Sequence, residues 1–119
     1  MRDHTKLRAF ELADRLALLV YSQTLSFPRE ECFGLTSQMR RVAVSTAFNI
    51  VKGAARQSLA DYIRFLDTAY GSARELEYQV SLADRLGYLP DPSILISLAR
   101  ETAMVLNGLI RSLRRKQPR

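Results

Sequence analysis

The sequence predicts an all-α protein whose helices pack as an antiparallel up-down four-helix bundle. Three observations predict this fold. Apolar residues recur at intervals of three and four, the period of an α-helix, along four separate segments. Proline and glycine residues separate these segments with short connections, which favour antiparallel neighbours. The length of 119 residues suits one domain, residues 1–119, with a core of its own.

The first two helices are predicted at about residues 7–25 and about residues 36–56. Pro28 cannot continue the first helix, because its ring disfavours helical angles at the preceding residue. Thr36 or Ser37 is predicted to cap the free amide groups at the start of the second helix. The apolar stripes contain Phe10, Ala13, Leu16, Ala17, Val20 and Tyr21 in the first helix, and Met39, Val42, Ala43, Thr46, Ile50 and Ala54 in the second.

The third helix is predicted at about residues 59–86, and the fourth begins at Pro92. Ser58 opens a Ser-x-x-Asp variant of the capping box, and Gly87 is expected to end the third helix with a positive φ. Asp91 followed by proline is a favoured start for a helix. These local signals agree with the apolar period, so each helix is predicted by two kinds of observation.

Positive charge is concentrated in two parts of the chain. The net charge is +6, yet residues 1–31 sum to zero and residues 61–110 sum to −3. Residues 32–60 carry four basic and no acidic side chains, and the basic C-terminal tail, residues 111–119, carries five and none. Fifteen of the eighteen basic residues are arginine, which suits bidentate contacts with phosphate or carboxylate.

This distribution singles out a set of basic side chains as candidates for nucleic-acid binding. The alternative is a solvated basic face, which the helix dipole alone favours at a C-terminal end. Structural or subunit contacts are a further alternative for the basic residues of the second helix. The candidates are Arg40, Lys52, Arg56, Arg111, Arg114, Arg115, Lys116 and Arg119.

Motifs in the second and third helices carry a family resemblance. They read Phe27-Pro28-x-x-Glu31, Gly34-Leu35-Thr36-Ser37-Gln38-Met39-Arg40-Arg41-x-Ala43-x-Ser45-x-x-Asn49-Ile50-x-x-Gly53, Arg56, and Tyr62-Ile63-x-Phe65-Leu66-x-x-Ala69-x-Gly71-Ser72-x-x-Glu75-Leu76. On these motifs the chain resembles the four-helix-bundle proteins encoded in intervening sequences of bacterial 23S ribosomal RNA genes. It resembles, more distantly, the accessory variability protein of diversity-generating retroelements.

The resemblance implies a small helical protein that assembles as a ring, usually a homopentamer, with no known enzymatic activity. For the retroelement relative it also implies a basic surface that binds nucleic acid, and a reverse-transcriptase partner. Members commonly carry an acidic residue before the glycine of the Asn-Ile-x-x-Gly motif, where this chain has Lys52. The departure makes this surface more basic and argues against any role that needs a carboxylate there.

Small and polar residues of these motifs are expected to form a structural clasp, inside the bundle or between subunits. Small residues permit close approach of helices, and buried polar groups must find partners. Arg41 and Glu75 are the natural candidates for an ion pair across helices. A ligand-binding or catalytic role and contact with nucleic acid stay open as alternatives. The motif consists of Gln38, Arg41, Ser45, Asn49, Gly53, Gly71, Ser72 and Glu75.

Aromatic residues on the apolar stripes are expected to pack in the core or in an interface. Phe48 is the exception, because it lies off the stripe of the second helix and is expected to be exposed in a monomer. Exposed apolar residues of this kind often mark subunit contacts. These aromatic residues, most of which lie on the stripes, are Phe10, Tyr21, Tyr62, Phe65, Tyr70 and Tyr78.

The inventory of reactive residues argues against an enzyme. The chain has one cysteine, Cys32, and one histidine, His4, which excludes an internal disulfide and leaves too few ligands for a His/Cys zinc site. No Walker loop, dinucleotide fingerprint or inward Glu-x-x-His pair is present. We therefore expect no cofactor, metal or catalytic residue. An enzyme site assembled between subunits is the remaining enzymatic alternative.

The sequence thus predicts a non-enzymatic oligomeric bundle that binds nucleic acid through basic surfaces. The alternative from another class is a protein-interaction scaffold with no direct nucleic-acid binding. The expected partners are copies of the same chain, RNA or DNA, and a nucleic-acid-processing protein. A cytoplasmic location without a membrane partner is expected, because the uncharged run Leu16–Phe27 is too short and too polar for a span.

Overall fold

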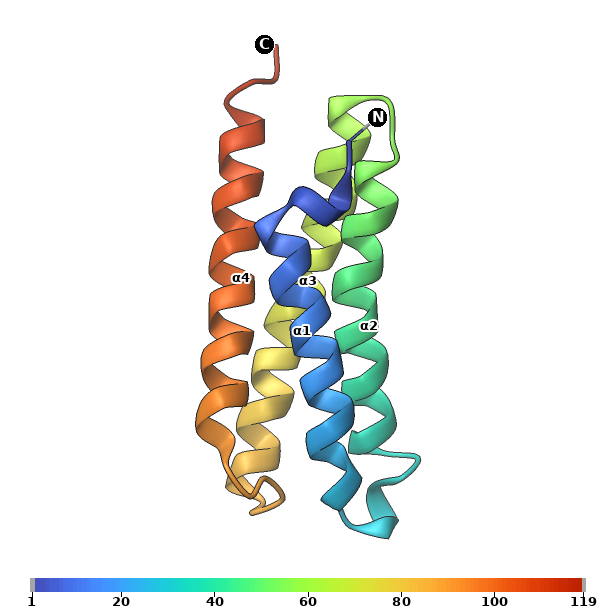
Figure 1. Ribbon diagram of the computed structural model, residues 1–119, viewed down its shortest axis with the longest axis vertical. Helices are drawn as coiled ribbons and strands as arrows, with labels where there is room; N and C mark the ends of the chain where they lie inside the picture. Colours follow the sequence, from blue (N-terminus) through green and yellow to red (C-terminus); the bar gives the residue numbers. More distant parts are fainter. Residues whose placement is uncertain (1, 119) are drawn as a thin grey trace.

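Four antiparallel helices make up the computed structural model, which describes residues 2–118 (Figure 1). They are α1 (Arg8–Gln23), α2 (Leu35–Ala54), α3 (Leu59–Arg85) and α4 (Pro92–Arg114). Short 3-10 turns occupy His4–Lys6, Thr24–Ser26 and Arg29–Glu31, and no strand occurs among the described residues. The predicted all-α four-helix fold is confirmed.

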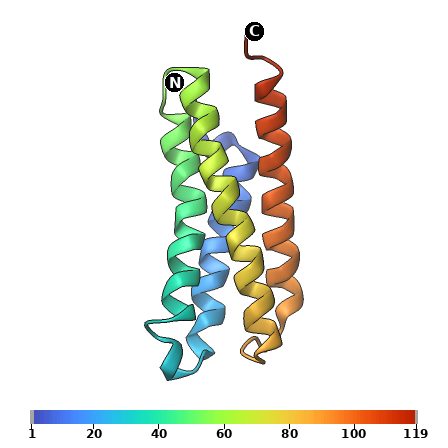
Figure 2. The same cartoon turned by 180° about the vertical axis from the view of Figure 1, so that it is seen from behind.

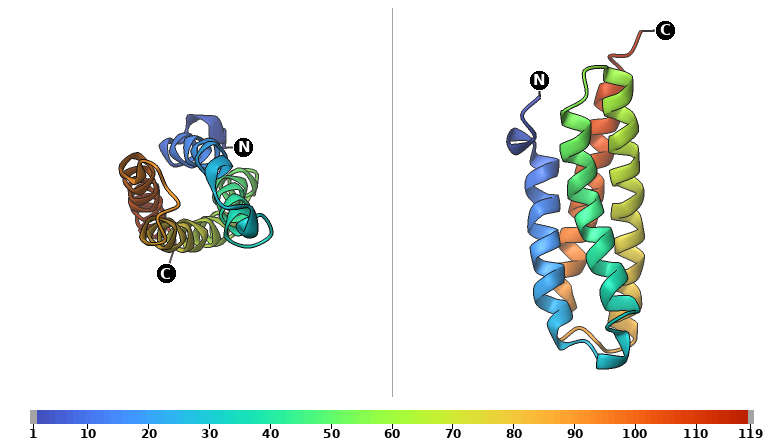
Figure 3. Two further views of the ribbon diagram at one scale, coloured as in Figure 1. Left: turned by 90° about the horizontal axis from the view of Figure 1, so that it is seen from below. Right: turned by 90° about the vertical axis from the view of Figure 1, so that its right-hand side faces the viewer.

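The helices run along the long axis of a body that measures 49 × 22 × 21 Å. Seen along that axis they lie at the four corners of the bundle in chain order, so α1 and α4 are also neighbours (Figure 3). The view from behind shows α3 lying between α2 and α4 (Figure 2). Each helix therefore contacts two others and leaves its outer face to solvent.

Apolar side chains fill the space between the helices in two clusters. The cluster nearer the α1–α2 and α3–α4 connections contains Leu12, Leu16, Met39, Leu76 and Leu95, each fully buried. The other cluster contains Ile50, Leu66, Leu106 and Ile110, together with Tyr62 at 2% exposure. Leu16, Met39 and Ile50 belong to the stripes predicted for the first two helices, because burial of one face is what stabilises an amphipathic helix.

Local signals at three helix ends are confirmed. The Ser58 hydroxyl accepts a hydrogen bond from the Asp61 amide at 3.0 Å, at the start of α3. The Asp91 carboxylate accepts one from the Ser93 amide at 3.3 Å, with Pro92 as the first residue of α4. Gly87 has a φ of 77°, as expected for the residue that ends α3.

The predicted cap of α2 is wrong. The helix begins at Leu35, so Thr36 and Ser37 lie inside its first turn rather than at the cap. The Glu31 carboxylate accepts the hydrogen bond from the Leu35 amide instead, at 3.1 Å. A carboxylate from the preceding 3-10 turn thus satisfies a free amide that the sequence assigned to a hydroxyl.

Among the described residues, α4 is the one helix long and apolar enough to cross a membrane by length and composition. Its apolar side chains Leu95, Leu106 and Ile110 are buried among the other helices. One face of α4 therefore packs against the rest of the bundle.

Candidate functional site

One end of the bundle gathers most of the positive charge, and we call it the cationic end. It consists of residues 2–6, 51–68 and 108–118, which meet because α2, α4 and the N-terminal segment all reach the start of α3. These segments carry nine basic and three acidic side chains. The rest of the described chain, residues 7–50 and 69–107 together, carries eight basic and nine acidic side chains. The basic residues are Arg2, Lys6, Lys52, Arg56, Arg64, Arg111, Arg114, Arg115 and Lys116.

Aromatic rings hold several of these cations in place. The Lys52 ammonium lies 5.0 Å from the centre of the Phe48 ring and 5.4 Å from that of Phe65. The guanidinium groups of Arg56 and Arg64 lie 4.6 Å and 4.9 Å from the Phe65 ring. Each pair is close enough for a cation–π attraction, which orders a long side chain without neutralising it.

The N-terminal segment adds a cation that the sequence analysis missed. The Arg2 guanidinium lies 4.2 Å from the Tyr62 ring centre and donates to the Arg56 carbonyl at 2.6 Å. Arg64 was missed as well. Arg2 and Arg64 join the basic cluster only in the folded chain, because the antiparallel packing brings the chain start and the first turns of α3 beside the end of α2.

The basic residues near the end of α4 differ in whether they pair with an acidic side chain of the same chain. Arg114 forms an ion pair with Asp67 of α3 at 2.5 Å, so its charge is partly used inside the molecule. Within residues 2–118, neither an ion pair nor a side-chain hydrogen bond involves Arg111, Arg115 or Lys116, all in the predicted basic tail. Arg119, the last predicted candidate, lies outside the described residues.

Arg40 lies apart from the cationic end, and its side chain forms contacts within the bundle. Its Nε donates to the Thr24 hydroxyl at 2.9 Å, and its guanidinium lies 4.7 Å from the Tyr21 ring centre. These contacts tie the first turns of α2 to the end of α1. The structure therefore favours the structural alternative for Arg40.

Part of the polar motif forms a hydrogen-bond network between α2 and α3. The hydroxyl oxygens of Ser45 and Ser72 lie 3.1 Å apart, and the Asn49 amide donates to the Ser45 carbonyl at 2.8 Å and to its hydroxyl at 3.1 Å. Asn49 is 7% exposed, so this network satisfies a buried polar group. The serines border an open groove of about 310 Å³, lined by Gln38, Arg41, Val42, Ser45, Ser72 and Glu75.

The expected Arg41–Glu75 ion pair does not form between the helices of one chain in residues 2–118, and a pair between subunits stays a prediction. Both residues are exposed at the groove, and no ion pair joins them among the described residues. Long side chains at the rim of an open groove keep their hydration, so pairing offers them little. The clasp in this chain is made of neutral groups.

The two glycines of the motif have different surroundings. Gly53 is buried against α3, where a Cβ would lie 2.9 Å from the Phe65 Cβ, so the expected close approach of helices is confirmed there. Gly71 is exposed, and a Cβ there would have no neighbour within 4 Å. Gly71 therefore makes no close approach within one chain, and an approach between subunits stays a prediction.

The aromatic residues divide into buried and exposed sets. Phe48 is 55% exposed, which confirms its expected exposure, and Tyr62 is buried as expected. Tyr21 and Tyr78 are 45% and 61% exposed, so they do not pack in the core of the single chain, and the interface alternative stays a prediction for these two. Phe10, Phe65 and Tyr70 are half-buried.

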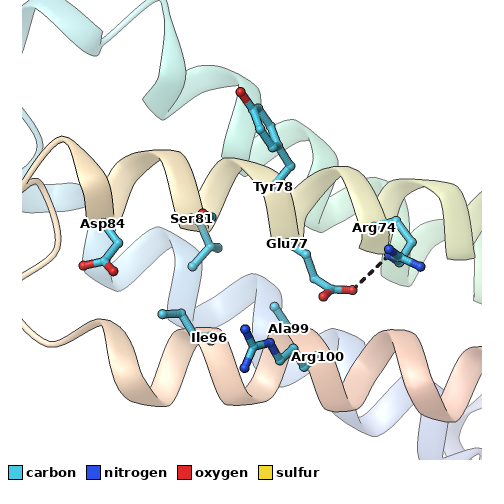
Figure 4. A pocket seen from close by; sticks show the side chains of 9 residues that line it. Arg74, Glu77, Tyr78, Ser81, Asp84, Ile96, Ala99 and Arg100 are labelled. Atoms are coloured by element: carbon cyan, nitrogen blue, oxygen red, sulfur yellow. Dashed lines mark ion pairs between the residues drawn. The ribbon is translucent and has the colours of Figure 1, made fainter.

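A second surface feature is an open cavity of about 450 Å³ between α3 and α4 (Figure 4). Arg74 and Glu77 form an ion pair at 3.3 Å on its α3 side, and Arg100 extends toward it from α4. Its lining mixes both charges with Tyr78 and Ile96. No cluster of three His, Cys, Asp or Glu side chains that could hold a metal occurs in the part of the chain that the structure describes.

Shifted tyrosine pKa values have local causes. Burial raises the pKa of Tyr62, and the nearby Arg2 opposes this effect. A hydrogen bond to the Glu31 carboxylate is the main cause that raises the pKa of Tyr88. Both phenols therefore stay neutral at physiological pH, and neither shift indicates a catalytic group.

Comparison with known proteins assigns the family. No curated protein is significantly similar to the chain. The solved structure of a protein of unknown function from the S23 ribosomal protein family of Bacteroides thetaiotaomicron superposes with a TM-score of 0.76 at 23% identity. The superposition covers 87% of this chain and 95% of that one, which supports the fold. The family model described as 23S rRNA-intervening sequence protein matches residues 5–108, so the chain belongs to that family.

Proposed function

We propose that the protein is a non-enzymatic oligomer that binds nucleic acid through the phosphate backbone at its cationic end. One observation carries the proposal: nine basic and three acidic side chains meet at this end, although they come from three separate segments. A cluster of this kind attracts a polyanion and releases its counterions. Its readout is expected to depend on backbone and shape, because the cations are held by aromatic rings and helix ends rather than placed for base edges.

The basic side chains of the cationic end form two groups that come from different parts of the chain. Lys52, in the last turn of α2, and Arg56, in the connection to α3, present ordered charges beside the Phe65 ring. Arg111, in the last turn of α4, and Arg115 and Lys116, just after its end, have no ion pair among the described residues. The two groups lie at the ends of different helices, so together they suit a ligand that crosses the end of the bundle.

Self-association is part of the proposal, and apolar side chains outside the core support it. Leu18, Ile94 and Met104 are 68%, 58% and 73% exposed. Leu18 and Ile94 border an open groove of about 360 Å³ between α1 and α4. A second copy that covers this surface removes apolar area from water and repeats the cationic end, which multiplies weak phosphate contacts.

Light scattering tests the self-association. The natural protein is expected to be an oligomer at micromolar concentration, and Leu18→Glu is expected to lower its mass while the separated chains stay folded, because Leu18 is 68% exposed. Thr68→Glu is the matched control on the exposed face of α3. A natural protein that is monomeric would contradict this part of the proposal.

The binding test keeps α4 intact. Removing residues after 110 would delete Leu113 and the Arg114–Asp67 ion pair, so substitutions are preferable. The test variant replaces Arg111, Arg115 and Lys116 with glutamine, and affinity for structured RNA and duplex DNA is measured over a range of salt concentrations. The slope of log affinity against log salt is expected to fall by about 3, close to one unit for each phosphate contact.

The control makes the same change of charge elsewhere. Arg29, Arg85 and Arg100 become glutamine, all outside the cationic end. Equal losses in both triple variants would indicate a nonspecific effect of net charge. No binding by the natural protein at low salt would overturn the proposal in favour of the scaffold alternative.

A further inference from the structure

An exposed aromatic ring lies on α2 one helical turn before the cationic end, beside its ordered charges. Phe48 projects from α2 with 55% of its surface exposed, whereas Phe65 is half-buried between α2 and α3. We infer that Phe48 stacks on an unpaired base, so that the cationic end prefers single-stranded nucleic acid to a duplex. This inference rests on the proposed function and specifies the form of the ligand.

The spacing of ring and charge fits a single nucleotide strand. Lys52 lies one helical turn after Phe48, with its ammonium 5.0 Å from the ring centre. A base on the ring would therefore leave its own or a neighbouring phosphate close to Lys52. Aromatic stacking platforms beside positive grooves are the usual means of binding single strands, because every base has a π face.

Phe65 has a different part in the same cluster. Three cations surround its ring, with Arg56 at 4.6 Å and Arg64 at 4.9 Å as the nearest. This ring serves to position charges and leaves Phe48 as the exposed platform. Arg64 is partly neutralised by Asp61 at 3.3 Å, whereas no acidic side chain pairs with Lys52 or Arg56 in residues 2–118.

A duplex cannot use this arrangement fully. Its bases are stacked and paired inside the helix, so it presents phosphates to the cations but no free π face to Phe48. The structure therefore separates two contributions to binding. Charge acts on any nucleic acid, and the exposed ring acts only where bases are unpaired.

The competing explanation of Phe48 is contact with a second copy of the chain, and the experiment distinguishes the two. The variants are Phe48→Leu, which removes the π face and keeps an apolar side chain, and Phe48→Trp, which restores a larger one. Tyr78→Leu is the matched control, because Tyr78 is an equally exposed aromatic on α3 at 61%, outside the cationic end.

Affinities are measured for a uridine strand and a thymidine strand of about 20 nucleotides, enough to cover one stacking site, and for an abasic strand and an RNA duplex of the same length. Phe48→Leu is expected to weaken single-strand binding at least about fivefold, to leave the abasic strand and the duplex unchanged, and to be rescued by Phe48→Trp. Equal effects on the uridine and thymidine strands would indicate that Phe48 contacts only the part of the base that both strands share. A larger effect on one strand would indicate that Phe48 also contacts the sugar or the base group in which that strand differs.

Three results would overturn the inference. Phe48→Leu with unchanged single-strand affinity would exclude stacking and leave the proposed phosphate binding in place. An equal loss on the abasic strand would show that the ring acts through the cations alone. A lower mass by light scattering for Phe48→Leu would assign the ring to a subunit contact. Absence of binding to every strand by the natural protein would overturn the proposed function itself.

Discussion

Gly53 packs directly against Phe65, and the absence of a side chain at Gly53 lets α2 and α3 approach closely there. A Cβ at Gly53 would lie 2.9 Å from the Phe65 Cβ and 3.3 Å from the carbonyl oxygen of Tyr62. These atoms belong to the start of the neighbouring helix rather than to the end of a flexible side chain. The contact sets the separation of the two helices at the base of the cationic end.

Gly53→Ala is therefore expected to destabilise the fold. The added methyl group has to push α3 away, and overpacking of this kind costs about 1–3 kcal/mol. Gly71→Ala is the matched control in α3, because no atom lies within 4 Å of the added Cβ. It is expected to stabilise the helix by about 0.5–1 kcal/mol. Urea unfolding of the variants gives both numbers, and a stable Gly53→Ala protein would contradict the contact.

Glu75→Arg is expected to change the unfolding free energy by less than about 0.5 kcal/mol, because Glu75 has no ionic partner within the described chain. Ser72→Val, in contrast, removes the partner of the Ser45 hydroxyl and is expected to cost about 1 kcal/mol. Chemical denaturation measures both variants. A loss of several kcal/mol for Glu75→Arg would show that the carboxylate is buried in the assembly.

Arg40→Gln separates a structural arginine from a binding one. The substitution removes the donor to Thr24 and the stack on Tyr21, and it is expected to cost about 1 kcal/mol of unfolding free energy. Affinity for RNA and its salt slope are expected to stay unchanged. Arg56→Gln provides the contrast, because it is expected to lower the salt slope by about 0.9. A lower slope for Arg40→Gln would place Arg40 in the interface after all.

The Tyr88–Glu31 hydrogen bond makes stability depend on pH in the alkaline range. The Tyr88 hydroxyl donates to the Glu31 carboxylate at 3.0 Å, and this bond is the main cause that raises the pKa of Tyr88. A raised pKa in the folded state contributes stability below the ordinary tyrosine pKa of about 10, and the contribution is lost as the pH rises through the folded value. Tyr88→Phe is therefore expected to be less stable than the natural protein at neutral pH.

The difference between Tyr88→Phe and the natural protein is expected to shrink when both are unfolded at alkaline pH. Tyr78→Phe is the control, since Tyr78 is exposed and is not bonded to Glu31. A difference that stays constant from neutral to alkaline pH would show that the bond to Glu31 does not contribute.

Local sequence determined the helices and most of their ends. The period of the apolar residues located four helices, because burial of one face requires a residue at every three or four positions. Ser58, Asp91 and Gly87 act within one turn of their own position, so their roles were readable without tertiary structure. The cap of α2 was not readable, because Glu31 reaches it from the preceding 3-10 turn.

Tertiary structure decided which of the predicted site residues lie close together. Antiparallel packing brought Lys52, Arg56 and the end of α4 to one end of the bundle and left Arg40 at the other. It also added Arg2 and Arg64, which no sequence motif marked. Charge attraction between groups far apart in sequence depends on distances that only the packed helices set, whereas helical period and capping depend on neighbours along the chain.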